Sequence, residues 1–169
     1  LNVLASLALL AGAGYDLAQF KTGCIQFAGL EHRMQKVTEH NGILYIEDSK
    51  GTNVGAVIAG VGGIDRPVHL ILGGDGKGQD VAPLRELVLK KCKSVAVIGQ
   101  DKDAILVTLA GIDNVSGYAS LEDAVSACIK NAVSGDAVIL SPACASWDMF
   151  TNYKHRAQVF VDSIYAHIH

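Results

Sequence analysis

The stretch VHLILGGDGKGQD, residues 68–80, decides the fold. It begins with the run VHLIL, which is apolar except for its histidine, and continues into a glycine-rich loop. A similar run, DAVILS at residues 136–141, lies nearer the end of the chain. Strands that are apolar almost throughout are typical of parallel sheets with helices on both faces. The two runs therefore predict central strands of a doubly wound α/β domain.

Three further strand candidates and five helical stretches accompany these runs. The strand candidates are ILYIED, SVAVIG and NVSGYA, at residues 43–48, 94–99 and 114–119. The helical stretches cover residues 53–61, 81–92, 102–109, 121–133 and 153–166. Strands that alternate with amphipathic helices indicate βα units around a mostly parallel sheet. We expect residues 31–169 to form this domain.

The first thirty residues have a different pattern, which predicts a pair of helices. A Leu- and Ala-rich helix is expected over residues 1–13, where AGAG ends it, and a second helix over residues 15–27. Thirty residues bury too little apolar surface to fold alone. We therefore expect residues 1–30 to be an incomplete piece of another domain.

Composition excludes two classes of partner. The 169 residues are 50% hydrophobic and carry a formal charge of −3, with acidic and basic residues mixed along the chain. That balance leaves no basic face for a nucleic acid. The most apolar segment runs for only about a dozen residues before its glycines, whereas a membrane span needs about 20. We expect neither a nucleic acid nor a membrane as partner.

The cysteines indicate a reducing compartment. Cys24, Cys92, Cys128 and Cys144 lie far apart, without a Cys-x-x-Cys pair or the Cys/His spacing of a zinc site. They are interpreted as buried thiols of a cytoplasmic protein, and no metal site is expected from them.

Two loops after predicted strands contain candidate ligand-binding residues. In such a sheet, ligands collect at the carboxyl ends of the strands, where loops and helix N-termini converge. The loop EDSKGTNVG, residues 47–55, offers polar side chains to an anion, although Thr52 is also explained as a helix N-cap. In the glycine-rich loop, Lys77 is placed to bind a carboxylate or a phosphate, and a flexible turn is the alternative. Its glycine spacing does not match the Walker pattern.

The loop LSPACASWDMF, residues 140–150, raises the question of a nucleophile. It lacks the Gly-x-Ser-x-Gly pattern, and nothing in the sequence locates a histidine base for Cys144. We interpret Cys144 as a packed thiol and the serines as hydrogen-bond donors to a bound carboxylate. Trp147, Phe150 and Tyr153 are expected in the core or in a pocket wall.

The segment EHR at residues 31–33 joins the two predicted parts of the chain. The planar guanidinium of Arg33 suits a phosphate or a nucleotide base, and an interdomain salt bridge explains it almost as well.

Taken in order, EHR, DSKGTN, GGDGK, SPACAS and R-A-x-x-F closely resemble the motifs of the Mur ligases, and within that family those of the member that adds D-glutamate. The resemblance covers the whole chain. It implies an ATP- and Mg²⁺-dependent ligase that joins D-glutamate to UDP-N-acetylmuramoyl-L-alanine through an acyl phosphate, in cytoplasmic peptidoglycan synthesis. Residues 31–169 would be its Rossmann-like C-terminal domain, and residues 1–30 the last helices of its central ATP-binding domain.

The same resemblance assigns roles to seven residues. D-glutamate would be held by Thr52, Lys77, Ser146 and the backbone N–H of Tyr153, and ATP would be contacted by Asn2, Arg33 and Asp48. No catalytic residue or metal ligand is assigned here, because the P-loop and the magnesium ligands are expected on the other domains. These residues alone are therefore expected to be inactive. The chain departs from the common family pattern at Gly51 and Trp147.

Two alternatives stay open at the level of sequence. The chain could be a stand-alone ligand-binding module that has the fold without the ATPase. It could also belong to another glutamate-adding amide ligase, such as a folylpolyglutamate synthase, although SPACAS argues against that assignment.

Overall fold

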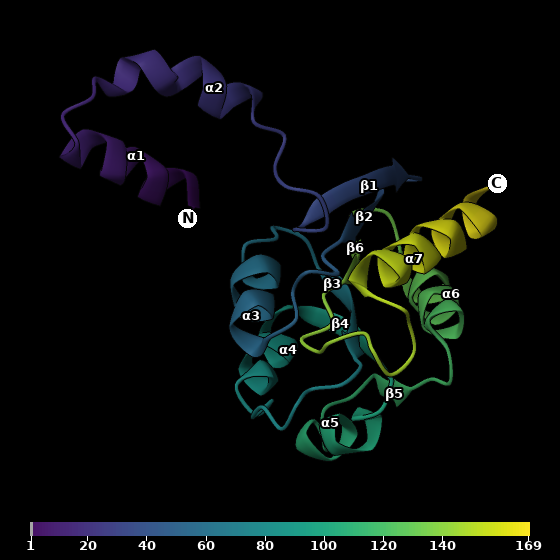
Figure 1. Cartoon of the computed structure of the whole chain (residues 1–169). Coiled ribbons are helices and arrows are strands. Elements are labelled where there is room, and N and C mark those ends of the chain that lie inside the picture. The colour runs from purple at the N-terminus through teal and green to yellow at the C-terminus, as the bar shows by residue number, and fades with distance from the viewer. Residues whose placement is uncertain (1) are drawn as a thin grey trace. The chain divides into compact units, whose positions relative to one another are not determined.

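The computed structural model describes residues 2–169 and divides into two compact units between Leu30 and Glu31 (Figure 1). The first unit contains helix α1 (Asn2–Gly12), a 3-10 helix η1 (Leu17–Phe20) and helix α2 (Lys21–Gln26). A single helix over residues 15–27 was expected here, and that prediction was wrong in detail. The Asp16 side chain caps the backbone N–H of Ala18, so helical structure begins only after it.

The second unit is built on a six-stranded sheet with the order β1-β2-β6-β3-β4-β5. All neighbouring strands are parallel except β1 and β2. The strands are β1 (Gln35–His40), β2 (Ile43–Glu47), β3 (Val68–Gly73), β4 (Cys92–Ile98), β5 (Val115–Gly117) and β6 (Ala137–Leu140). The helices are α3 (Val54–Gly62), α4 (Leu84–Lys91), α5 (Lys102–Thr108), α6 (Leu121–Asn131) and α7 (Tyr153–Ile168). The predicted α/β class, the five strands and the helices between them are confirmed.

Strand β1 was not predicted. Its sequence QKVTEH is largely polar and lacks the apolar run of the other strands, and half of its residues are exposed at the sheet edge. It pairs antiparallel with β2 across a tight turn in which Asn41 and Gly42 both have positive φ, 51° and 77°. An Asn-Gly pair is a strong hairpin signal, and it was the local clue to this strand.

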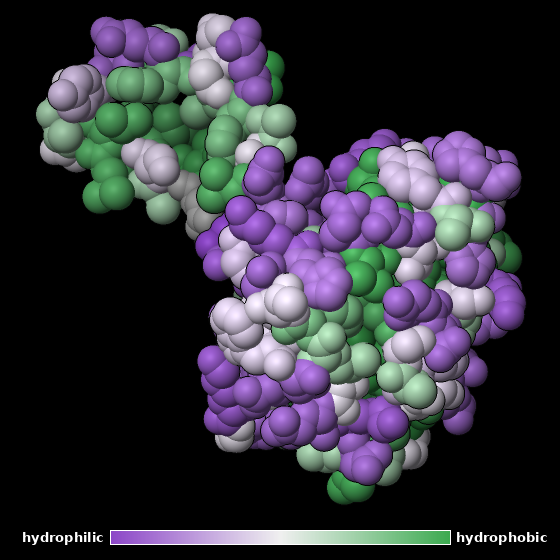
Figure 2. All heavy atoms as spheres, turned by 45° about the vertical axis from the view of Figure 1, so that its right-hand side comes forward, coloured by the Kyte–Doolittle hydropathy of each residue, from purple (hydrophilic) through white to green (hydrophobic). Residues whose placement is uncertain are grey.

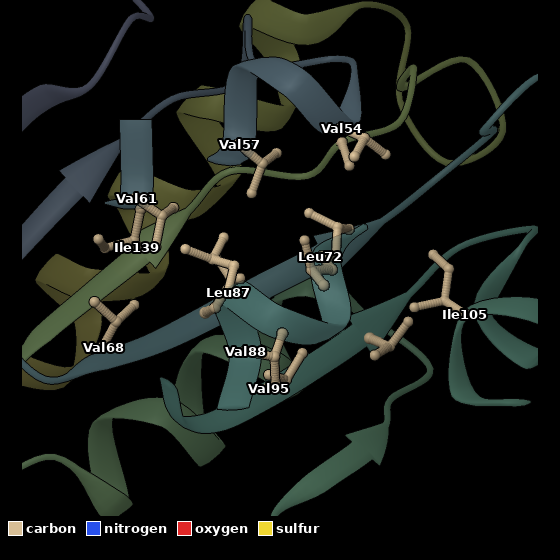
Figure 3. Packing of buried hydrophobic residues seen from close by; sticks show 14 of the residues in the cluster. Val54, Val57, Val61, Val68, Leu72, Leu87, Val88, Val95, Ile105 and Ile139 are labelled. Atoms are coloured by element: carbon tan, nitrogen blue, oxygen red, sulfur yellow. The ribbon is translucent and has the colours of Figure 1, made fainter. Parts of the chain in front are cut away.

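The core lies in two layers, one on each face of the sheet. Helices α3, α4 and α5 cover one face, and Figure 3 shows Val57, Leu72 and Leu87 packed there. Helices α6 and α7 cover the other face. Along β3, Leu70 and Leu72 point to the first layer and Ile71 to the second. This double coverage explains why β3 and β6 are buried at every residue.

Candidate functional site

The candidate site lies at the edge of the sheet where the parallel strands end. Strands β2, β6 and β3 run side by side and in the same direction. The loops that follow them, residues 48–53, 141–152 and 74–80, therefore leave the sheet at the same edge. This is the edge at which ligands of doubly wound sheets bind.

Backbone hydrogen bonds join the three loops directly. The N–H of Ala143 donates to the carbonyl of Gly51 at 2.9 Å. Asp75 and Ala145 exchange two bonds, 3.1 Å from the Asp75 N–H and 2.8 Å from the Ala145 N–H. The loop after β6, which carries Ser146, is thus hydrogen-bonded to both the loop that carries Thr52 and the loop that carries Lys77.

Gln79 ties the glycine-rich loop to the start of α3. Its side-chain nitrogen donates to the carbonyl of Ala143 at 2.6 Å, and its oxygen accepts the N–H of Val54 at 3.1 Å. The cap of α3 is Asn53, whose side chain accepts the N–H of Ala56. The interpretation of Thr52 as the N-cap was therefore wrong, and the Thr52 side chain is exposed at the site.

Arg156 is the residue that the sequence reasoning missed. It lies fully buried on α7, and its Nε donates to the Ser49 hydroxyl at 2.9 Å. One terminal nitrogen donates to the Ser49 carbonyl at 2.8 Å, and the other to the carbonyls of Cys144 and Ala145 at 3.0 and 3.3 Å. Burial lowers the pKa of Arg156 to about 10, so the group keeps its charge at neutral pH. The signal was the R-A-x-x-F motif, because Ala157 and Phe160 are core residues.

Asp48 is buried beneath the same loops. Its carboxylate accepts the N–H of Met34 at 3.1 Å and the hydroxyl of Ser141 at 2.6 Å. Burial raises the pKa of Asp48, and these two hydrogen bonds oppose that shift. In this structure Asp48 holds the chain before β1 against the loop after β6. Ser141 is thus a hydrogen-bond donor to a carboxylate of the protein itself.

Tyr153, the first residue of α7, forms part of the wall of the site. The ammonium of Lys50 lies 3.9 Å from the centre of its ring, and the His32 ring packs edge-on at 5.4 Å. His32 in turn contacts the buried carboxylate of Glu47 at 2.8 Å. The cation–π contact places the segment before Thr52 beside the N-terminus of α7.

The candidate D-glutamate residues differ in exposure. Thr52 and Lys77 are exposed, whereas Ser146 is buried and its carbonyl accepts the N–H of Phe150 at 2.8 Å. Lys77 has a φ of 52°, in the left-handed region, and its N–H donates to the Asp75 side chain at 2.9 Å. This turn fixes the backbone that carries the lysine.

The candidate nucleotide residues are less closely grouped. Arg33 is exposed, and its positive charge partly opposes the rise that burial causes in the pKa of Asp48. The side chain of Asn2 lies outside the described residues. Among residues 2–169, no group of three or more His, Cys, Asp or Glu side chains is arranged to hold a metal ion.

Cys144 has the properties of a packed thiol. It is fully buried, and burial raises its pKa to about 12. A thiol with that pKa supplies almost no thiolate at neutral pH, which argues against a nucleophile. Trp147, three residues later, is 67% exposed, so it is not a core residue, and its place in a pocket wall stays a prediction.

Comparisons with known proteins identify the family. The family model described as "Mur ligase, glutamate ligase domain" matches residues 32–144. The chain belongs to the Mur ligase family. It is 48% identical over 170 residues to UDP-N-acetylmuramoylalanine–D-glutamate ligase of Chromobacterium violaceum, covering 98% of this chain and 37% of that protein. For the same-named protein of Dechloromonas aromatica, the identity is 46%, over 96% of this chain and 36% of that protein. The chain thus spans little more than a third of these relatives.

Solved structures share the fold. A murein peptide ligase from Psychrobacter arcticus superposes with a TM-score of 0.58 at 16% identity, covering 96% of this chain and 36% of that one. A bifunctional folylpolyglutamate synthase/dihydrofolate synthase from Yersinia pestis also gives 0.58, at 18% identity, over 81% of this chain and 32% of that one. No helix within residues 2–169 is both long enough and apolar enough to cross a membrane.

Proposed function

We propose that this chain is the amino-acid-binding part of an ATP-dependent ligase that adds D-glutamate to UDP-N-acetylmuramoyl-L-alanine. The relatives that match it over nearly its whole length are named for that activity. One structural observation supports the proposal above the others. Three hydrogen-bonded loops expose the Lys77 ammonium and the Thr52 hydroxyl at one edge of the sheet. An ammonium and hydroxyls are the groups that bind a dicarboxylate.

In this proposal, the residues of the chain hold and orient D-glutamate and do not react with it. Lys77, Thr52 and Ser146 bind its two carboxylates. The N–H of Tyr153 adds a donor, because the first residue of a helix has no acceptor within the helix. The Asn152 side chain already accepts the next two N–H groups, at 2.9 and 3.0 Å, and leaves that of Tyr153 available.

The reaction itself is an acyl transfer. The amine of D-glutamate attacks the carbonyl carbon of the muramoyl-alanine acyl phosphate, a tetrahedral intermediate forms, and phosphate leaves as the amide forms. The loops contribute by positioning the amine and by excluding other orientations. The hydrogen bonds between the loops keep that position rigid, and catalysis by positioning depends on such rigidity.

ATP supplies the phosphoryl group that activates the acceptor carboxylate. Of the residues assigned to ATP, Arg33 is exposed and suits a phosphate or a base. The Asp48 carboxylate already accepts hydrogen bonds from Met34 and Ser141. The described residues do not form a Mg²⁺ site by themselves. We therefore propose that other parts of the ligase hold magnesium and most of the nucleotide, and that this chain alone is inactive.

We further propose that residues 1–30 belong to the central ATP-binding domain. Their described part contains eight large hydrophobic side chains that are exposed: Val3, Leu4, Leu9, Tyr15, Leu17, Ile25, Phe27 and Leu30. Figure 2 shows apolar residues gathered on the visible face of this small unit. Apolar patches of this kind mark surfaces that another protein region covers. We place the ligase in the cytoplasm, where the four free thiols of this chain persist.

The alternative of a folylpolyglutamate synthase rests on the shared fold alone. The identity to that structure is 18%, against 46% and 48% to the two relatives named above. A stand-alone binding module predicts instead that residues 1–169 bind D-glutamate without the other domains.

The test is Lys77→Ala in the complete ligase. Loss of a charged hydrogen bond to a carboxylate costs about 1.5–3 kcal/mol, so the KM for D-glutamate should rise roughly 10- to 100-fold. The KM for ATP should stay within about twofold of wild type. Lys130→Ala, an exposed lysine on α6, is the matched control. Equal effects of Lys77→Ala on both KM values would reject the assigned role.

A further inference from the structure

A groove between α3 and α4 lies away from the candidate site and has no role in the proposed ligase. We define the α3–α4 groove by Ile58, Gly62, Leu87, Leu89, Lys90 and Lys91, which line a cavity of about 700 Å³. A second hollow of about 410 Å³ shares Lys90 and Lys91 with it. The two hollows therefore adjoin on the surface at these two lysines.

The floor of this surface is apolar and open. Leu89 is 64% exposed and Ile58 is 37% exposed. A Cβ added at Gly62 would meet only the Leu87 side chain, at 4.0 Å, so the glycine leaves room for an incoming side chain. Exposed apolar residues beside unfilled volume are typical of a contact surface.

The rim of the surface is positively charged. Around the α3–α4 groove, Arg85, Lys90 and Lys91 outnumber the one acidic residue, Glu86. In the second hollow, Arg66 and Lys93 are paired with Glu39 and Asp136, so the positive excess comes from Arg85, Lys90 and Lys91. The chain as a whole carries −3, so this concentration of positive charge is local. Lysines in the last turn of α4 also favour the helix dipole, but that effect explains neither the exposed Leu89 nor the space at Gly62.

We propose that the α3–α4 groove binds an acidic amphipathic helix of a partner protein. The positive rim complements acidic side chains, and the apolar floor accepts Leu-type side chains at helical spacing. A concave groove fits a helix better than it fits the flat surface of a bilayer. The proposal concerns a surface outside the candidate site, so it stands independently of the ligase activity.

The probe is a synthetic, fluorescently labelled peptide of about 16 residues, with Leu at positions i, i+3, i+4 and i+7 and Glu on the flanks. A second peptide carries Lys in place of every Glu. By fluorescence anisotropy, the Glu peptide should bind residues 1–169 at least roughly tenfold more tightly than the Lys peptide. Peptide-induced NMR shifts should centre on Ile58 and Leu89.

Two variants test the rim and the floor separately. Lys90→Glu should weaken the binding of the Glu peptide, because the attraction to its glutamates becomes a repulsion. The same change should strengthen the binding of the Lys peptide. Gly62→Leu should lower the affinity for the Glu peptide roughly tenfold, because the leucine fills the groove without changing any charge. Lys130→Glu, a matched charge reversal on α6, should leave the affinity for both peptides unchanged. Circular dichroism melts check that each variant is folded.

Equal binding of the two peptides would overturn the proposal, and so would a Gly62→Leu variant that binds as wild type does. A third arm uses vesicles of phosphatidylcholine and phosphatidylglycerol. If the chain sediments with these vesicles but binds neither peptide, the surface is a membrane contact and the proposal is wrong.

Discussion

Replacing Arg156 by Met should release the loops of the candidate site. Methionine fills much of the same volume but donates no hydrogen bond, so the carbonyls of Ser49, Cys144 and Ala145 lose a buried partner. Four hydrogen bonds from a charged group at about 1.5 kcal/mol each give a gross loss of about 6 kcal/mol. Desolvating the guanidinium costs several kcal/mol, which the variant regains. A net destabilisation of about 3 kcal/mol follows.

That loss is large compared with the typical stability of a domain, about 5–15 kcal/mol. For a chain of this length it corresponds to a fall in Tm of roughly 6–12 °C. Urea unfolding should be followed by circular dichroism and by the emission of Trp147, the single tryptophan, which lies in the loop that Arg156 holds. The Trp147 emission of the folded variant should also change, because its loop has lost an anchor.

The matched control is Lys154→Ala, an exposed residue on the same helix. Its unfolding free energy should lie within about 0.5 kcal/mol of wild type. Arg156→Lys keeps the charge but cannot reach both loops at once, and it should recover less than half of the loss. If Arg156→Met unfolds with wild-type stability and unchanged Trp147 emission, the guanidinium does not hold the loops, and the reasoning fails.

The remaining predictions concern titratable groups. Burial raises the pKa of Asp48 above 3.8, so its contribution to stability is full below that pH and is lost as the pH rises through the raised value. Urea titrations from roughly pH 4 to pH 7 should therefore show wild type losing stability relative to Asp48→Asn; a constant difference would contradict the shift. Burial raises the pKa of Cys92, Cys128 and Cys144 to about 12. A thiol reagent at pH 8 should thus label Cys24 long before these three, and early labelling of Cys144 would speak against its packing.

Local pattern was sufficient for most of the fold. The strands β3 and β6 are apolar because both of their faces are buried, and that property is visible residue by residue. The same rule predicted that the polar loops after the strands would meet at one edge. The search for apolar runs failed for β1, because its residues are largely polar. They pair with β2 only because the Asn41-Gly42 turn returns the chain beside that strand.

The sequence by itself thus determined the α/β class, the family motifs and the edge of the sheet at which the site lies, since these depend on periodicity and on adjacent residues. Only the tertiary structure decided what holds the site together. Arg156 reaches Ser49 across 107 residues of chain, and Gln79 reaches Ala143 across 64. No local pattern encodes such contacts, because each partner comes within hydrogen-bonding distance only after the strands have paired and the helices have covered the sheet.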